Sequence, residues 1–201
     1  MASSPMDESQ TASTSTSQSV GSLVNFLTLI QSLKTTKRTG WINHGVAGPE
    51  SIADHMYRMA MMAFMIDPKD AAVDRDRCIR MAIVHDVAEA LVGDITPDDG
   101  ISKEEKNRRE AAAMEHMCLL LGETPQAQEM RDLWLEYDAA STLEAKLVKD
   151  FDKLEMILQA QEYEASQGKV LDDFFVAAGR IQTDIGKKLA DEIVVRRPNK
   201  R

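Results

Sequence analysis

The chain has 201 residues and a formal net charge of -9 at pH 7; 43% of its residues are hydrophobic and 28% are charged. This length favours one domain, and the composition is close to the globular average, which excludes a fibre or a wholly disordered chain. The negative charge disfavours long nucleic acid as a partner, because it would repel a phosphate backbone. No apolar run reaches the roughly 18 to 20 residues that cross a bilayer, so no membrane association is expected.

The start of the chain differs in composition from the rest. We expect residues 1–22, mostly Ser, Thr, Gln and Ala, to be a disordered tail because they bury too little apolar surface to offset the entropy of ordering. The tail lacks the basic start and apolar segment of a secretory signal, and Asp7 and Glu8 argue against an organellar transit peptide. Cys78 and Cys118 lack zinc-finger spacing and suit a reducing compartment. We therefore expect a cytoplasmic protein, with a plastid, whose signals are rich in Ser, as the alternative.

Residues 23–197 carry apolar side chains at helical spacing and predict a single all-α domain. Residues 34–48 contain three glycines and are expected to form a loop. The expected helices run from about 23 to 33, from Pro49 to about 67, from Arg75 to Val92, from Ser102 to Leu121, from Pro125 to Tyr137 and from Ser141 to Ser166, with one or two more between 171 and 193.

The third expected helix directs an acid into the core. In the segment AIVHDVAEALVGDITP, residues 82–97, helical spacing puts Asp86 on the same inward stripe as Ile83 and Val87. An unpaired buried charge costs several kcal/mol, so Asp86 requires a cation, a strong set of hydrogen bonds or a raised pKa. For an isolated His-Asp pair, the simpler interpretation is a polar helix edge with Asp86 capping a neighbouring loop.

His55 is a second polar residue beside an apolar stripe, that of the preceding helix. A lone histidine there is usually a hydrogen-bonded core residue. Two histidines, His55 and His85, and an acid on the inward sides of adjacent helices are better explained by a divalent metal. The nitrogen and oxygen donors suit Mn, Co, Fe or Zn, and the absence of cysteine from the set excludes a thiolate zinc site.

The sixth expected helix offers a further ligand in the run VKDFDKLEMIL, through Asp150 or Asp152. Both sides of this helix carry apolar residues, so each acid lies near an apolar stripe. Helical periodicity slightly favours Asp150. The alternative is that either acid is a surface residue.

The order of these residues carries a resemblance. His55, the doublet His85-Asp86 and a distant Asp in a DKLE context together resemble the HD-domain metal-dependent phosphohydrolases. The segments PESIADHMYRMAMMA, HDVAEALVGDITP and KEEKNRREAAAM resemble more narrowly the eukaryotic HD-domain 5'-deoxynucleotidases and their shorter bacterial relatives, over about residues 23–195. The resemblance implies a compact HD-domain helical bundle with one metal site between three helices.

The resemblance also implies roles for single residues. The metal, which could be Mn, Co, Zn, Fe or Mg, is expected to be held by His55, His85, Asp86 and Asp152, where periodicity favoured Asp150.

Glu89 of HDVAE resembles the acid that assists the attacking water, and Asp94 of GDITP resembles a residue that holds the phosphate and water network. The structural alternatives are a helical i,i+4 partner for Glu89 and a turn-forming role for Asp94.

The loop KRTGWINHG is the expected substrate selector. Arg38 and Trp41 resemble the Arg and Trp with which these enzymes grip the phosphate and press against the sugar. The bacterial pattern has these two residues adjacent, whereas two residues separate them here, so Lys37 is the alternative to Arg38. The alternative for Trp41 is a loop aromatic that covers the core. We assign His44 and His116 to the surface.

The activity implied by the resemblance is hydrolysis of deoxynucleoside 5'-monophosphates to deoxynucleoside and phosphate, by a homodimer. Deoxyribose would be preferred if Trp41 and the backbone fill the space that a 2'-hydroxyl needs. Little dependence on the base is expected, because no set of base-reading side chains is evident.

Three alternatives to this activity stay open. Another HD-family activity, phosphodiesterase or triphosphohydrolase, uses the same metal, although a triphosphate needs more basic residues than this loop offers. A hydrolase of another small phosphate metabolite is the second alternative. A non-catalytic helical scaffold is the most distant, because it would leave His55 and Asp86 buried without a purpose.

Overall fold

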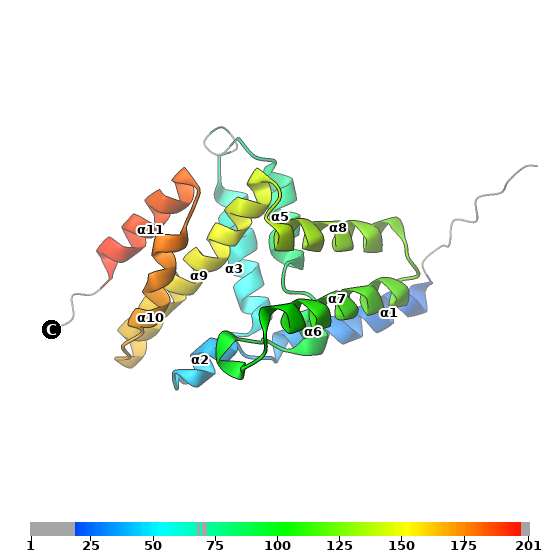
Figure 1. Ribbon diagram of the computed structural model, residues 1–201, viewed down its shortest axis with the longest axis horizontal. Helices are drawn as coiled ribbons and strands as arrows, with labels where there is room; N and C mark the ends of the chain where they lie inside the picture. The colour runs from blue at the N-terminus through cyan, green and yellow to red at the C-terminus, as the bar shows by residue number, and fades with distance from the viewer. Residues whose placement is uncertain (1–18, 68, 70–71, 198–201) are drawn as a thin grey trace, which may run out of the picture.

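The computed structural model describes residues 19–67, 69 and 72–197 (Figure 1). Within these ranges the chain is helical, and the one β-type pairing is an isolated bridge between Lys37 and Ser51. This confirms the expected all-α class. Most of the expected tail, residues 1–18, lies outside the described residues.

The longer helices follow the expected order, with shifted ends. α1 begins before the expected start at residue 23, because the Ser19 side chain caps it by accepting a hydrogen bond from the Ser22 backbone N–H. α3 begins after Pro49, where Ser51 and Asp54 form a reciprocal capping box. These helices are α1 (Val20–Leu29), α3 (Ile52–Met65), α5 (Arg75–Val84), α7 (Lys103–Leu120), α8 (Pro125–Ala139), α9 (Leu143–Gln167) and α11 (Asp184–Arg196).

Short helical pieces fill the connections between them. The expected loop at residues 34–48 contains one of these pieces, α2, which the glycine-rich sequence did not predict. They are η1 (Ile30–Lys34), α2 (Thr39–Asn43), α6 (Glu89–Val92), η2 (Pro97–Asp99), α10 (Asp172–Phe175) and η3 (Val176–Arg180).

α3 lies in the middle of the fold and packs against α5 and α9, with α11 and α10 on one side and α1, α7 and α8 on the other (Figure 1). Met59, Met81, Phe151 and Leu154 fill the contact between the three central helices and are fully buried. Burying each such side chain stabilises the fold by about 1.5–3 kcal/mol. The polar residues discussed below therefore sit on a rigid, well-packed frame. No helix within the described ranges is long and apolar enough to span a membrane.

The third expected helix is not continuous, and this corrects the expectation of one helix from Arg75 to Val92. α5 ends at Val84, and i→i+3 backbone hydrogen bonds follow, such as that from the Val87 N–H to the Val84 carbonyl. The His85 ring contributes to the break, because its Nδ1 lies 2.9 Å from the Ala82 carbonyl oxygen, which in an uninterrupted helix would accept the Asp86 N–H.

The inward stripe of α5 also differs from the expected one. It consists of Cys78, Met81 and Ala82, and the same spacing continues to His85, which is 3% exposed. Ile83, expected on that stripe, is 54% exposed. The turn after α5, rather than a helical stripe, directs Asp86 inward.

Candidate functional site

Residues from three parts of the fold converge beside α3. His55 lies on α3, His85 and Asp86 lie in the turn after α5, and Asp152 lies on α9. His55 Nε2 is 3.3 Å from Asp152 Oδ1 and 3.9 Å from Asp86 Oδ2, and His85 Nε2 is 3.1 Å from Asp86 Oδ2. One ligand atom each from His55, His85 and Asp152 lie within 4.8 Å of one another. The four residues expected to be metal ligands are therefore neighbours.

Hydrogen bonds orient the imidazoles of His55 and His85 so that their Nε2 atoms face the carboxylates. His85 Nδ1 meets the Ala82 carbonyl, and His55 Nδ1 lies 2.6 Å from Glu155 Oε2. A carbonyl or carboxylate oxygen only accepts, so both Nδ1 atoms carry the proton and donate. Both Nε2 atoms are buried, have no hydrogen-bond partner among the described residues and face carboxylate oxygens. This donor set fits a divalent cation.

The electrostatics of the cluster favour a cation there. Burial acts to raise the pKa of Asp86 and Asp152, but the adjacent histidines and Arg38 hold both values well below the usual range. Burial and Arg38 act to lower the pKa of His55, yet the carboxylates of Asp152 and Glu155 raise it to about 9. The cluster thus keeps its acids ionised and stabilises positive charge between them.

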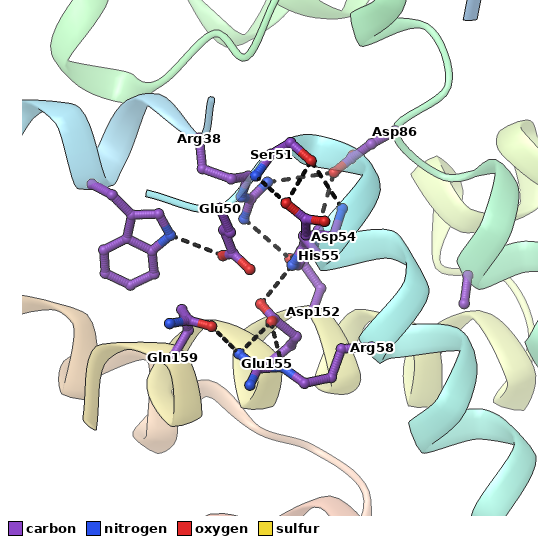
Figure 2. Close-up of polar contacts among 12 residues, drawn as sticks. Arg38, Glu50, Ser51, Asp54, His55, Arg58, Asp86, Asp152, Glu155 and Gln159 are labelled. Atoms are coloured by element: carbon purple, nitrogen blue, oxygen red, sulfur yellow. Dashed lines mark hydrogen bonds and ion pairs between the residues drawn. The ribbon is translucent and has the colours of Figure 1, made fainter. Parts of the chain in front are cut away.

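Arg38 reaches this cluster, whereas Lys37 does not. The Arg38 guanidinium lies 3.4 Å from Asp86 Oδ2 and 3.9 Å from Asp152 Oδ1 (Figure 2). Lys37 is exposed and pairs through its backbone with Ser51. Of the two basic residues considered for substrate binding, Arg38 is the one beside the cluster of His55, His85, Asp86 and Asp152.

Asp150 faces away from the cluster. Its carboxylate accepts hydrogen bonds from the backbone N–H groups of Gln182 and Thr183 and from the Thr183 hydroxyl, at 2.7–3.1 Å. These bonds anchor the segment that leads into α11. Periodicity favoured Asp150 as the metal ligand, and the structure instead puts Asp152 beside His55.

Glu89 is buried in the first turn of α6, 3% exposed. Burial raises its pKa well above the usual range, and the charges of Asp86 and Asp94 add to this effect. Its Oε1 lies 3.7 Å from Lys106 Nζ on α7, and its Oε2 has no hydrogen-bond partner within the described part of the chain. A buried carboxyl with one free oxygen and a raised pKa is suited to proton transfer.

Asp94 joins two loops beside the cluster. Its Oδ2 accepts a hydrogen bond of 2.6 Å from the Thr39 backbone N–H, and the Thr39 hydroxyl donates to the Asp94 carbonyl at 2.7 Å. Asp94 therefore holds the start of α2, the element that follows Arg38 and carries Trp41. These bonds link residues 55 positions apart, whereas the turn-forming role considered for Asp94 would need local ones.

Trp41 borders a pocket but is largely covered. Its ring is 2% exposed, stacks on Phe174 with centroids 4.3 Å apart, and meets the edge of Tyr163 at 5.3 Å. Its Nε1 donates to Glu50 Oε1 at 2.9 Å. The pocket has a volume of about 200 Å³ and is lined by Arg38, Gly40, Trp41, His44, Asp94, Thr96, Pro97, Asp98, Met156 and Phe174. Arg38 thus borders both the pocket and the metal cluster.

Sequence reasoning did not identify several neighbours of the cluster. Glu155 contacts His55, and the Tyr137 hydroxyl donates to Asp152 Oδ2 at 3.0 Å. Phe174 lines the pocket from a segment 133 positions after Trp41. Of these residues, only Glu155 could have been predicted from the sequence, because it lies three residues after Asp152 and therefore on the same face of α9. The two remaining histidines differ, since His116 is exposed as expected and His44 is half-buried against Phe174.

Comparisons with known proteins agree with this geometry. A family model described as HD domain matches residues 30–192. The chain belongs to the HD domain family. Among its HD relatives, 5'-deoxynucleotidase HDDC2 of Xenopus laevis is 50% identical over 164 residues, covering 80% of each chain. The 5'-deoxynucleotidase hdd1 of Schizosaccharomyces pombe is 46% identical over 181 residues, covering 88% of this chain and 90% of the relative.

A solved structure has a similar fold. The PH0347 protein from Pyrococcus horikoshii superposes with a TM-score of 0.71 at 34% identity, covering 86% of this chain and 96% of that one. The family match confirms the expected HD-domain helical bundle.

Proposed function

We propose that this HD-domain protein is a metal-dependent 5'-deoxynucleotidase that hydrolyses deoxynucleoside 5'-monophosphates to deoxynucleoside and inorganic phosphate. The observation that carries the proposal is the identity of about half the residues to relatives named 5'-deoxynucleotidases, over four fifths or more of both chains. The matched region includes the helices that hold the His and Asp cluster.

The metal centre of this activity is assigned to His55, His85, Asp86 and Asp152. Two buried imidazole nitrogens without hydrogen-bond partners in the described ranges, opposite ionised carboxylates, support a first-row divalent ion such as Mn, Co, Zn or Fe over Mg, which prefers oxygen ligands. When bound, such an ion lowers the pKa of a coordinated water and neutralises charge on phosphoryl oxygens.

Arg38 and Glu89 supply the remaining chemistry. Arg38 sits between the cluster and the pocket, where its guanidinium can hold phosphate oxygens and stabilise the charge that develops on them. Glu89 has a buried, unpartnered carboxyl oxygen that can hold or accept the proton of the attacking water. Asp94 follows α6, which carries Glu89, and its hydrogen bonds to Thr39 hold the segment that carries Arg38 beside it.

The sugar and the base are assigned to the pocket beyond Arg38. Trp41 and Phe174 form one wall and Thr96 and Pro97 belong to the lining of the same pocket. Aromatic and apolar walls hold a deoxyribose and stack on any base without reading its hydrogen-bonding edge. This supports a preference set by the sugar rather than by the base.

A homodimer and a cytoplasmic location complete the proposal. The apolar groove of about 700 Å³ between α3, α9 and α11 is a surface that a second copy could cover. Its lining includes Met61, Met62, Met65, Leu158, Leu189 and Ile193. Light scattering of the purified protein tests the dimer. The free thiols of Cys78 and Cys118 suit the reducing cytoplasm, which localisation of a fluorescent fusion tests.

Phosphate release tests the proposed reaction. The protein is stripped of metal, reloaded with Mn, Co, Zn, Fe or Mg, and assayed on a panel of deoxynucleoside and ribonucleoside 5'-monophosphates. We expect metal-dependent turnover that is faster with the deoxy series. His85→Ala is expected to abolish turnover, whereas His116→Ala is the matched control, because it removes an exposed histidine. Metal-bound protein without turnover of any monophosphate would refute the proposed reaction.

A further inference from the structure

Glu155 is a buried acid on α9 that no part of the proposed reaction uses. It is 0% exposed, and both of its oxygens are engaged. Oε2 lies 2.6 Å from His55 Nδ1, and Oε1 accepts from Arg58 Nε at 2.8 Å (Figure 2). A buried carboxylate is stable only with such partners. Glu155 thus bridges Arg58 and His55.

Arg58 is itself fixed by the same helix. Its guanidinium contacts Glu155, Gln159 and Glu162, which are spaced at i, i+4 and i+7 and so share one face of α9. These contacts join α3 to α9 and leave Arg58 little freedom to move. The Glu155 carboxylate is consequently held in one orientation, with Oε2 directed at His55.

The contact with Glu155 determines which nitrogen of the His55 ring is available to bind a metal. With Nδ1 donating to Glu155, that nitrogen keeps its proton when a metal takes Nε2, which is turned toward Asp152 and Asp86. Carboxylates in this position behind a metal-binding imidazole fix its tautomer and ring orientation. His85 is oriented by the Ala82 carbonyl, so only His55 depends on a side chain for this.

We propose that Glu155, held in place by Arg58, is the positioning residue that orients His55 for metal binding. The proposal rests on the metal centre of the proposed function. It predicts that the charge and geometry of Glu155 affect metal affinity although Glu155 does not face the metal cluster itself.

Cobalt binding to Glu155→Gln tests the proposal, because glutamine keeps the size but loses the charge. We expect the cobalt dissociation constant to rise by about 10- to 100-fold. The visible absorption spectrum of bound cobalt should also change, because the ring is less firmly held. The measurement is titration of the metal-free protein with cobalt, followed by absorbance and by competition with a chelator.

Glu136→Gln is the matched control. Glu136 is another buried acid paired with an arginine, Arg77, but it lies on α8 and contacts none of the four proposed ligands. Both variants remove the charge of a buried acid paired with an arginine, so both should unfold at lower temperature. Only Glu155→Gln should bind cobalt more weakly, which separates positioning from general stability.

Arg58→Lys provides a second variant if Glu155→Gln does not fold. Lysine retains a cation beside Glu155 but lacks the planar guanidinium N–H donors that hold the carboxylate. We expect it to weaken cobalt binding, but less than Glu155→Gln does. Parent-like cobalt affinity and spectrum in a folded Glu155→Gln or Arg58→Lys protein would overturn the proposal. If the parent binds cobalt and Glu155→Gln binds it weakly, but no monophosphate is hydrolysed, the positioning role stands and the proposed reaction fails.

Discussion

Asp150 and Asp152 are two residues apart on α9 and serve opposite sides of the helix. Asp152 Oδ1 lies 3.3 Å from His55 Nε2, whereas Asp150 accepts hydrogen bonds from Gln182 and Thr183 before α11. One helical turn thus supplies a residue of the candidate metal site and an anchor for α11. The two acids can be separated experimentally.

Substituting each acid by its amide should produce opposite phenotypes. Asp152→Asn is expected to lower metal affinity and phosphate release by about 100-fold or more while the protein stays folded, because losing even an outer partner of a ligand costs roughly 10- to 100-fold. Asp150→Asn is expected to lower the free energy of unfolding by about 1–3 kcal/mol, because a buried acceptor for several donors is weakened, and to keep metal binding. Denaturant unfolding and metal analysis of both variants provide the measurements. Loss of metal in Asp150→Asn, but not in Asp152→Asn, would reverse the assignment.

Arg38 and Lys37 should differ in their effect on turnover. Arg38→Ala is expected to lower kcat/KM by about 100-fold or more, because a charge-assisted contact to the phosphate is lost. Lys37→Ala should change kcat/KM by less than about threefold, because the Lys37 side chain is exposed and its bridge to Ser51 is made by the backbone. Steady-state kinetics on one deoxynucleoside monophosphate decide between them. Equal losses would show that Arg38 has no special role.

Phe174 should act on the base rather than on the phosphate. Removing its ring in Phe174→Ala is expected to raise KM for deoxynucleoside monophosphates by about fivefold or more, since base–aromatic stacking contributes roughly 1–3 kcal/mol. The KM for 2-deoxyribose 5-phosphate, which has no base, should stay within about twofold of the parent value. An equal rise for both substrates would instead indicate that the pocket had collapsed around Trp41.

Metal should stabilise the fold as well as supply chemistry. Binding to the folded state alone contributes about 2.7 kcal/mol when free metal is 100 times its dissociation constant. We therefore expect a chelator to lower Tm of the parent by several degrees and to leave His85→Ala nearly unchanged. Calorimetry with and without chelator provides the comparison. A parent Tm that does not respond to chelator would contradict tight metal binding.

Glu50 should make stability depend on pH. Burial, together with the charge of Glu155, raises the pKa of Glu50 from 4.5 to about 7. The folded state then holds a proton that the unfolded state releases, so this group stabilises the fold fully below about pH 4.5 and loses that effect as pH rises through 7. Glu50→Gln does not titrate and can still accept from Trp41. Its stability relative to the parent should therefore increase between pH 5 and pH 8, as measured by denaturant unfolding; a constant difference would contradict the raised pKa.

Much of the fold was predictable from local pattern. Apolar spacing located the long helices, and α7 begins at Lys103, directly after its N-cap Ser102, close to the expected start. The break after α5 was not predictable from spacing, because the sequence through His85 continues a helical pattern. The break involves a hydrogen bond between the His85 ring and the Ala82 carbonyl, and side-chain bonds of this kind leave no periodic signal.

The sequence by itself determined which chemical groups are available: two histidines and two acids in a family order, and a loop with Arg38 and Trp41. Helical spacing did not decide which acid on α9 belongs to the cluster, although the family resemblance implied Asp152. Only the tertiary structure showed Asp152 beside His55, Asp150 bonded to Gln182 and Thr183, and Glu155 and Arg58 behind the His55 ring. The physical reason is that α9 is buried on several faces, so its periodicity does not distinguish one apolar side from another. The partner of each polar group then depends on which helix packs against that side, and no local pattern records this.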